Sequence, residues 1–319
     1  MREYIIIVAV FAGLLLGVPP IYGRVFGEGG DSSAADSHLS ADYDFPQQIS
    51  MLLTESGEVV QIGIEDYLIG CLFAQIPATY HQQALNAQAV AAHSYLLRML
   101  EDGVVISDDA ASCQPFFTAQ IARQRYGDDY DNYLEIFRAA ARHGANRALF
   151  FEGAPIYAVY HGISAGVTNT AFSVWGQDFP YLQSVESSWD REHPNFIVHN
   201  EMTSESIRLA IFDYNRTASM PIDYSQWFVD IFKNEYGYVL SVKAGETTLS
   251  GGDMWRIFNL RSTAFETSFR SGGVFVFETR GFGHGVGLSQ YGADVLGRRG
   301  FSSDDILKHY YTNIEIVMV

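Results

Sequence analysis

The segment of this chain with the clearest chemical potential is a run of alternating glycines around a histidine. It reads Gly281-Phe282-Gly283-His284-Gly285-Val286-Gly287 and continues into Leu288-Ser289-Gln290-Tyr291. Alternating glycines allow positive φ angles and a close approach of the backbone to another group, whereas a tight turn needs only one or two of them. The spacing does not fit the dinucleotide-binding fingerprint, which has two residues before its third glycine. We therefore expect a binding segment here, with a purely structural role as the alternative.

Other familiar kinds of active site are absent from the sequence. No segment matches the phosphate-binding P-loop, the His-Glu-x-x-His zinc motif or the Gly-x-Ser-x-Gly nucleophile elbow. The chain carries 37 acidic and 20 basic side chains, which gives a formal charge of −17. Because contact with a phosphate backbone needs a basic surface, we do not expect nucleic acid as a partner.

The N-terminus predicts a membrane anchor followed by a tether. Residues 4–23 contain no charged side chain, and such a run is just long enough to span a hydrocarbon core. Arg2 before the run favours an N-terminus that stays inside the cell. The alternative is a cleaved signal peptide, although no Ala-x-Ala site follows. We expect an anchor over residues 1–23, a flexible polar tether over residues 24–48 and a folded extracytoplasmic domain over residues 49–319.

The elements of the folded part follow from its hydrophobic periodicity. The pattern predicts a hairpin of residues 49–53 and 58–62, a helix over residues 64–73 that stops before Pro77, and a helix with Thr79 as N-cap that runs to about residue 100. The many alanines of the last helix predict close packing against a neighbour. Further along, we expect a polar loop over residues 108–118, helices over residues 128–142 and 200–215, and strands over residues 148–151, 156–161, 238–242, 274–278 and 315–319. Helices and strands are interspersed without a regular βαβ repeat, so the predicted class is α+β.

Several segments together resemble the stage II sporulation protein D family, which includes the amidase enhancer. The glycine run, extended to Ala293, is similar to the C-terminal signature of that family. The other similar segments are Glu65-Asp66-Tyr67-Leu68-Ile69-Gly70, Ala84-Leu85-Asn86-Ala87-Gln88-Ala89-Val90-Ala91-Ala92, His161-Gly162-Ile163-Ser164-Ala165-Gly166, Val174-Trp175-Gly176, and Pro180-Tyr181-Leu182 with Val185, Trp189 and Asp190. They keep the order of the family over roughly the whole folded part, which implies a single domain of that type.

The resemblance implies a lytic transglycosylase, which breaks the bond after N-acetylmuramic acid in peptidoglycan and leaves a 1,6-anhydro end. Such an enzyme needs a carboxylic acid that protonates the leaving oxygen and later takes a proton from the attacking sugar hydroxyl. In the family this acid is a Glu in an Ala-x-Glu-Met-Pro-type stretch. Here the stretch reads Phe73-Ala74-Gln75-Ile76-Pro77, and Gln75 cannot deliver a proton at neutral pH.

A second departure lies in the following helix, where the family has an arginine and this chain has His93. The pKa of histidine near neutrality makes His93 the first candidate for a substitute acid. The interpretation that we favour is that it fills the place of the arginine. The residues that we expect to bind substrate are His161, Ser164, His284, Ser289, Gln290 and Tyr291.

We expect neither metal nor cofactor. Some family members bind zinc in a loop with cysteine and histidine after this helix, but residues 108–114 hold only Cys113 and no histidine. One ligand cannot make a closed zinc site. A disulfide between Cys71 and Cys113 is left open by the sequence.

The expected function is that of a sporulation-associated, membrane-anchored protein that binds peptidoglycan glycan strands during engulfment, with weak or no cleavage. The first alternative is an active lytic transglycosylase that uses another acid. The second is a non-enzymatic activator or scaffold of a partner amidase. The expected partners are glycan strands, a cell-wall amidase and other membrane proteins of engulfment.

Overall fold

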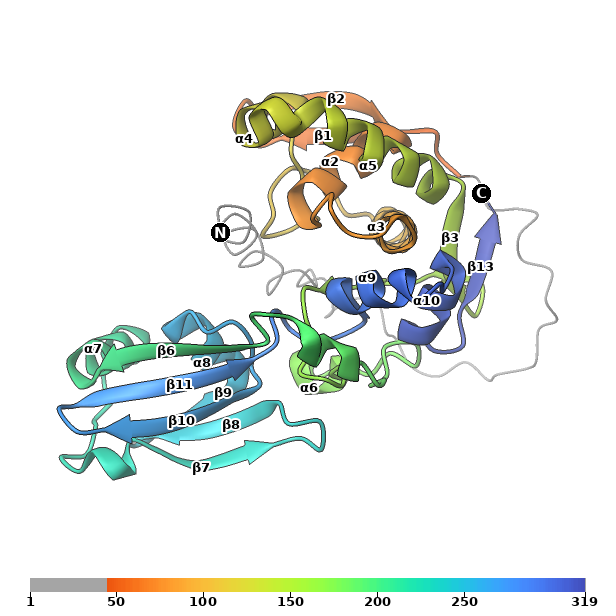
Figure 1. The fold of residues 1–319 in the computed structure, drawn as a ribbon. Helices are drawn as coiled ribbons and strands as arrows, with labels where there is room; N and C mark the ends of the chain where they lie inside the picture. The colour runs from red at the N-terminus through yellow and green to blue at the C-terminus, as the bar shows by residue number, and fades with distance from the viewer. Residues whose placement is uncertain (1–44, 319) are drawn as a thin grey trace, which may run out of the picture. The chain divides into compact units, whose positions relative to one another are not determined.

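The computed structural model describes residues 45–318 of the chain. The predicted anchor, residues 1–23, lies outside this range, and so do residues 24–44 of the predicted tether. Within the described range, no helix is both long enough and apolar enough to cross a membrane. Helices and strands are interspersed along the chain (Figure 1), which confirms the predicted α+β class.

The described residues form two compact units. The first contains residues 45–158, 297–307 and 313–318, and the second contains residues 159–296 and 308–312. The chain passes between the units four times, and two of these passages fall within the helices α9 (Gln290–Arg298) and α10 (Ser303–Tyr310).

The predicted hairpin opens the first unit. β1 (Gln48–Leu53) pairs antiparallel with β2 (Glu58–Gly63). The turn between them contains Gly57 with a φ of 71°, a conformation that glycine adopts without strain. α2 (Ile64–Gln75) follows immediately and ends before Pro77, because a proline disfavours helical geometry in the residue that precedes it.

The alanine-rich helix packs closely against a neighbour, as its composition predicts. This helix is α3 (Gln82–Glu101), and it contacts α5 (Tyr130–Ala145). A Cβ atom built on Gly144 of α5 would lie 2.6 Å from the Cβ of Ala89, closer than real side chains approach each other. A glycine opposite an alanine therefore sets the spacing of the two helices.

The start of α3 differs from the expected capping box. Its N-cap is His81, whose Nδ1 accepts a hydrogen bond from the backbone N–H of Gln83 at 3.3 Å. Thr79 lies two residues earlier, within a turn in which the N–H of Tyr80 donates to the carbonyl oxygen of Pro77. Because this turn has to close before the chain can become helical, the helix begins later than predicted.

A three-stranded antiparallel sheet completes the first unit. Its order is β13-β3-β4, made by β13 (Glu315–Met318), β3 (Arg147–Phe151) and β4 (Ala154–Pro155). Phe150 of β3 packs with Leu97 of α3 in a buried cluster. Among the elements of this unit, the sequence did not predict α4 (Ala119–Tyr126), which buries a single side chain and so carries little periodic signal.

Two antiparallel sheets dominate the second unit (Figure 1). The first has the order β10-β11-β6 and consists of β6 (Ile197–Thr203), β10 (Phe265–Arg270) and β11 (Val274–Arg280). The second has the order β7-β8-β9 and consists of β7 (Phe228–Lys233), β8 (Val239–Ala244) and β9 (Thr247–Ser250). Helices α7 (Ser204–Tyr214) and α8 (Gly251–Phe258) contact each other, and α8 packs on β8 and β9.

The helix expected over residues 200–215 is only partly correct, because its first four residues belong to strand β6. Side chains along this strand alternate between exposed and half-buried positions, which is the period of a strand. Thr203 ends the strand and caps α7, since its hydroxyl accepts from the N–H of Ser206 at 3.2 Å.

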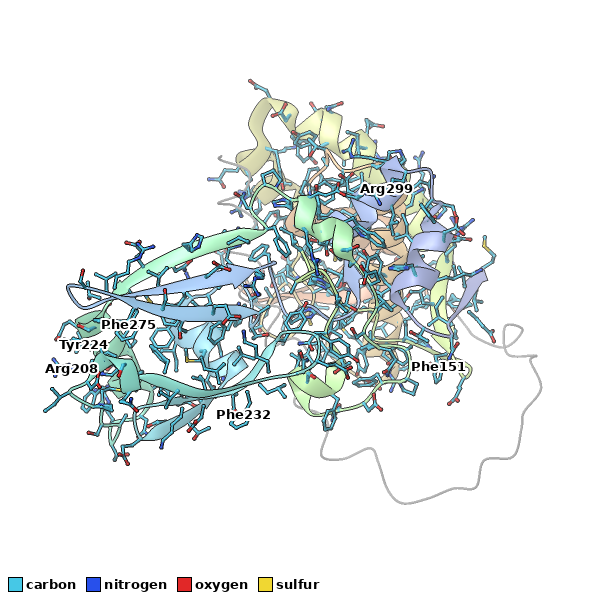
Figure 2. The ribbon with its side chains drawn as sticks, turned by 60° about the horizontal axis from the view of Figure 1, so that its bottom comes forward. Phe151, Arg208, Tyr224, Phe232, Phe275 and Arg299 are labelled. Carbon is cyan, nitrogen blue, oxygen red and sulfur yellow. The ribbon has the colours of Figure 1, made fainter. Side chains whose placement is uncertain are left out.

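Aromatic rings form much of the interior of the second unit. Phe275 of β11 stacks on Trp227 with a centroid separation of 5.2 Å, and it meets Tyr224 edge-on at 6.2 Å. Figure 2 shows Tyr224 and Phe275 close together near Arg208. Such stacked and edge-on pairs add to the stability that burial alone provides.

The strand expected over residues 156–161 is shortened to its last two residues. β5 (Tyr160–His161) pairs in parallel with β12 (Leu288–Ser289), a strand of equal length. Residues 156–159, which precede β5, are buried but do not form a strand. Their apolar side chains are therefore explained by burial alone.

Candidate functional site

The glycine run adopts the backbone conformation that its sequence predicts. Gly281, Gly283, Gly285 and Gly287 all have positive φ angles, between 71° and 100°, where other residues are strained. A Cβ atom on Gly281 would lie only 2.6 Å from the carbonyl oxygen of Ile163. The run therefore lies backbone to backbone against the segment that contains the other predicted site residues.

The pairing of β5 with β12 brings these two segments into register. Ser289 lies opposite His161. Nδ1 of His161 lies 3.0 Å from the carbonyl oxygen of Val286, and the N–H of Val286 donates to Nδ1 of His284 at 3.0 Å. One residue of the glycine run thus fixes the orientation of both histidine rings, which are 5.8 Å apart between centroids.

Both histidines are neutral at physiological pH. Burial lowers the pKa of His161 to about 3, with a further contribution from the neighbouring His284, and burial lowers the pKa of His284 to about 4. Neutral imidazoles can donate or accept hydrogen bonds, but groups with these pKa values are not proton donors to a substrate at pH 7.

Trp175 joins this cluster, and the sequence did not mark it as a site residue. It is the last residue of α6 (Ala171–Trp175), and its ring lies 5.2 Å from the ring of His284. Val174-Trp175-Gly176 is one of the segments similar to the family, so the signal was present. We name the three rings of His161, His284 and Trp175 the ring cluster.

A buried carboxylate, Asp190, connects the segments around the ring cluster. It accepts hydrogen bonds from the backbone N–H of Ser164 at 2.8 Å and from the hydroxyls of Ser187 and Ser289 at 3.1 and 2.9 Å. Burial raises the pKa of Asp190 to about 6, while these donors favour the ionised form. Its side chain has no exposed surface, so its role within this arrangement is to hold two predicted site segments together.

The remaining predicted residues of the second unit lie near this network. The hydroxyl of Ser164 accepts from the N–H of Gly166 at 3.1 Å, and Gln290 is buried at the start of α9. Tyr291 is half-buried and meets His193 edge-on, with 4.6 Å between ring centroids. Of the six predicted binding residues, Tyr291 is therefore the one with appreciable exposure.

Gln75 and His93 belong to the first unit, where both side chains are buried. Gln75 is the last residue of α2, and its Nε2 donates to the carbonyl oxygen of Pro115 at 2.9 Å. This bond uses the amide hydrogens, which a carboxylate would lack.

The His93 ring is held by backbone carbonyl groups. Its Nδ1 lies 3.0 Å from the oxygen of Gly144 and 2.9 Å from that of Arg147. Burial lowers the pKa of His93, although both carbonyl groups oppose this shift. Through Nδ1 the ring joins the end of α5 to the start of β3, while its Nε2 is buried without a partner among the described residues.

The two cysteines are free and buried in the structure. Burial raises the pKa of the Cys71 thiol, and the sulfur of Cys113 accepts a hydrogen bond from the N–H of Ser107 at 3.3 Å. Within residues 45–318, no group of three or more His, Cys, Asp and Glu side chains is placed to hold a metal ion.

Comparison with known proteins places these features in a family. Residues 54–151 match the family model described as Stage II sporulation protein. The chain is 28% identical to stage II sporulation protein D of Bacillus subtilis (strain 168), over 99% of this chain and 96% of that protein. It is 29% identical to the protein of the same name from Bacillus amyloliquefaciens, over 85% and 79% of the two chains. It is also 26% identical to the amidase enhancer of Bacillus subtilis (strain 168), over 76% of this chain and 39% of that protein.

The matched family model and these relatives support a role related to sporulation and the cell wall. The matched family model and the two relatives named stage II sporulation protein D show that the chain is similar to this family.

Proposed function

We propose that this protein acts in sporulation as a peptidoglycan-binding protein that holds glycan strands during engulfment and cleaves them weakly or not at all. The similarity to stage II sporulation protein D and to an amidase enhancer supports a role at the cell wall. The binding role is assigned to His161, Ser164, His284, Ser289, Gln290 and Tyr291.

The observation that carries this proposal is the chemistry at position 75. An amide stands where the family has a carboxylic acid, and its Nε2 donates to the carbonyl oxygen of Pro115. An amide does not release and recover a proton at neutral pH, and loss of a general acid–base group lowers rates about 10²–10⁴-fold. His93 is the alternative acid, but its Nδ1 is engaged with two carbonyl oxygens and burial lowers its pKa.

A second candidate function is the activation of a partner amidase. The similarity to the amidase enhancer, which extends over 76% of this chain, favours it. Activation needs a surface that binds the glycan or the partner enzyme, and it needs no proton donor. Purified amidase assayed on cell walls with and without this protein would measure the effect directly.

The site of action in this proposal is the outer face of the cell membrane. Its support is the uncharged run at residues 4–23 together with Arg2 before it. Protease added to intact protoplasts should remove the folded part while cytoplasmic markers remain whole. Full protection would contradict an external location, and release into the medium would indicate a cleaved signal peptide.

The deciding experiment separates binding from cleavage. Peptide-stripped glycan strands are incubated with the purified protein, and the bound and soluble fractions are analysed by mass spectrometry for 1,6-anhydro ends. We expect strands to be retained without a rise in these ends. Rapid formation of 1,6-anhydro ends would show an active lytic transglycosylase and refute the proposal.

A further inference from the structure

Two polar atoms of the ring cluster are buried without a hydrogen-bond partner in the described part of the chain. They are Nε2 of His161 and Nε1 of Trp175. A buried polar atom that has lost its water without gaining a partner is costly, and most such atoms in proteins are satisfied. The presence of two such unpartnered atoms in one cluster therefore needs a physical explanation.

The two atoms have opposite hydrogen-bonding character. Nδ1 of His161 lies 3.0 Å from a carbonyl oxygen, that of Val286, so Nδ1 carries the hydrogen of the neutral ring. Nε2 of His161 is therefore an acceptor, because a neutral imidazole holds one hydrogen. The indole Nε1 of Trp175 is a donor only.

The third ring of the cluster already has partners within the described residues. Nδ1 of His284 accepts from the N–H of Val286, and His284 also bonds to the backbone of Tyr160. His284 lies in contact with both other rings. The cluster therefore offers one donor and one acceptor, with neither bearing a charge.

Trp175 is the member of the ring cluster with appreciable exposed surface. Its side chain is half-buried, whereas His161 has no exposed surface and His284 is 3% exposed. A ligand that accepts a hydrogen bond from Nε1 of Trp175 should change the environment of that indole ring.

We propose that His161 and Trp175 form a subsite for one hydroxyl group of a sugar. The hydroxyl donates its hydrogen to Nε2 of His161, and its oxygen accepts from Nε1 of Trp175. A carboxylate or phosphate would meet the lone pair of Nε2, and the three rings of the cluster carry no positive charge to offset the repulsion; an ammonium group cannot accept from the indole. The subsite rests on the proposed binding of glycan strands and adds Trp175 to it.

Two substitutions remove the two atoms singly and keep the surrounding contacts. His161→Asn places an amide nitrogen near the position of Nδ1, so that the bond to Val286 is kept and the acceptor is lost. Trp175→Phe keeps an aromatic ring and removes the donor. Trp255→Phe is the matched control, because Nε1 of Trp255 is also buried and unpartnered in the described residues but lies in α8, outside the ring cluster.

The test measures binding of the full-length chain to peptide-stripped glycan strands and, in parallel, the indole N–H resonances. His161→Asn and Trp175→Phe should each raise the dissociation constant about 2–10-fold, the size expected for one neutral hydrogen bond, while Trp255→Phe binds as the wild type does. The chain has four tryptophans, and each Phe substitution identifies one resonance. Glycan should move the resonance of Trp175 and leave that of Trp255 unchanged.

The outcomes separate this subsite from the proposed function. If the wild type retains strands but the Trp175 resonance does not move and the variants bind normally, the subsite is wrong and the proposed function stands. A bound water that stays in contact with the Trp175 N–H after glycan is added would likewise show that the subsite is wrong. If the wild type retains no strands, the proposed function fails, and titration with N-acetylglucosamine decides the subsite. A shift of the Trp175 resonance then supports the subsite, and its absence overturns it.

Discussion

Returning a carboxyl group to position 75 should make the stability of this protein depend on pH. Gln75 is 1% exposed, and its Nε2 donates to the carbonyl oxygen of Pro115 at 2.9 Å. In Gln75→Glu, an ionised carboxylate would point an oxygen at that carbonyl oxygen within a buried site. The protonated form can still donate a hydrogen bond there. Burial and the lost donor therefore both favour the protonated form and raise the pKa of the new carboxyl.

The magnitude follows from the degree of burial. Full burial raises the pKa of a carboxyl by up to about 3–5 units, and each unit corresponds to about 1.4 kcal/mol. A shift of about 3 units would leave the variant close to wild-type stability below about pH 4, the pKa of the unfolded carboxyl. Stability would then fall by about 4 kcal/mol as the pH rises through the folded pKa near 7. This loss is large against the usual 5–15 kcal/mol of a folded domain.

The assay is urea denaturation of the variant and the wild type at pH 4.5, 6 and 8. The wild-type amide does not titrate, so the difference between the two proteins isolates the new carboxyl. Gln114→Glu is the matched control for burial, because Nε2 of Gln114 is likewise buried and donates to the carbonyl oxygen of Ala92 at 3.0 Å. Both variants should show the pH dependence, and only Gln75→Glu should gain 1,6-anhydro products. A pH-independent difference would refute the reasoning about burial, and cleavage by Gln114→Glu would refute the assignment of the acid position.

Two further predictions concern the glycine run and the histidines. Gly287→Ala should have a melting temperature well below that of Gly300→Ala. Both glycines have a positive φ, but only at Gly287 would an added Cβ atom meet the carbonyl oxygen of Val159. Equal losses of melting temperature in the two variants would contradict the close approach at Gly287. Stability should fall as the pH drops from 6.5 to 4.5, by about 2–3 kcal/mol for each of His161 and His284, because their folded pKa values of about 3 and 4 lie below the unfolded value of 6.5. His284→Asn, which keeps an acceptor for the neighbouring N–H, should lack the contribution of His284, so that its stability falls by about 2–3 kcal/mol less than that of the wild type over this range in urea titrations. An equal pH dependence in the variant and the wild type would show that the ring of His284 is not held neutral.

The local patterns of the sequence predicted the parts of the fold that local rules govern. The hairpin, the end of α2 before Pro77 and the positive φ angles of the glycine run depend on residues close together in the chain, and all three are confirmed. The capping box at Thr79 was wrong because a turn from Pro77 competes for the same residues. The start of α7 was misplaced because the last residues of β6 are mostly polar, and such a segment also fits the exposed face of a helix.

Local sequence patterns could not predict the contacts between segments that lie far apart in the chain. Asp190 receives hydrogen bonds from residues 26 positions before it and 99 positions after it, and no sequence spacing indicates that arrangement. The sequence therefore placed Asp190 in a segment similar to the family but did not indicate its role as a connection between segments. Trp175 was noticed as part of a motif but not as a member of a site, because its contact with His284 also spans more than a hundred residues.

Proton chemistry, taken separately in each unit, favours binding over cleavage. In the second unit, burial keeps His161 and His284 neutral well below pH 7. Asp190 has a pKa of about 6 but no exposed surface, and three donors surround it. In the first unit, the position of the family acid carries an amide, and the ring of His93 is engaged with carbonyl oxygens. The amide and the histidines with lowered pKa values are not proton donors at neutral pH, whereas hydrogen bonding to a neutral sugar requires neither charge nor proton transfer. These features support the proposal that the protein binds glycan strands.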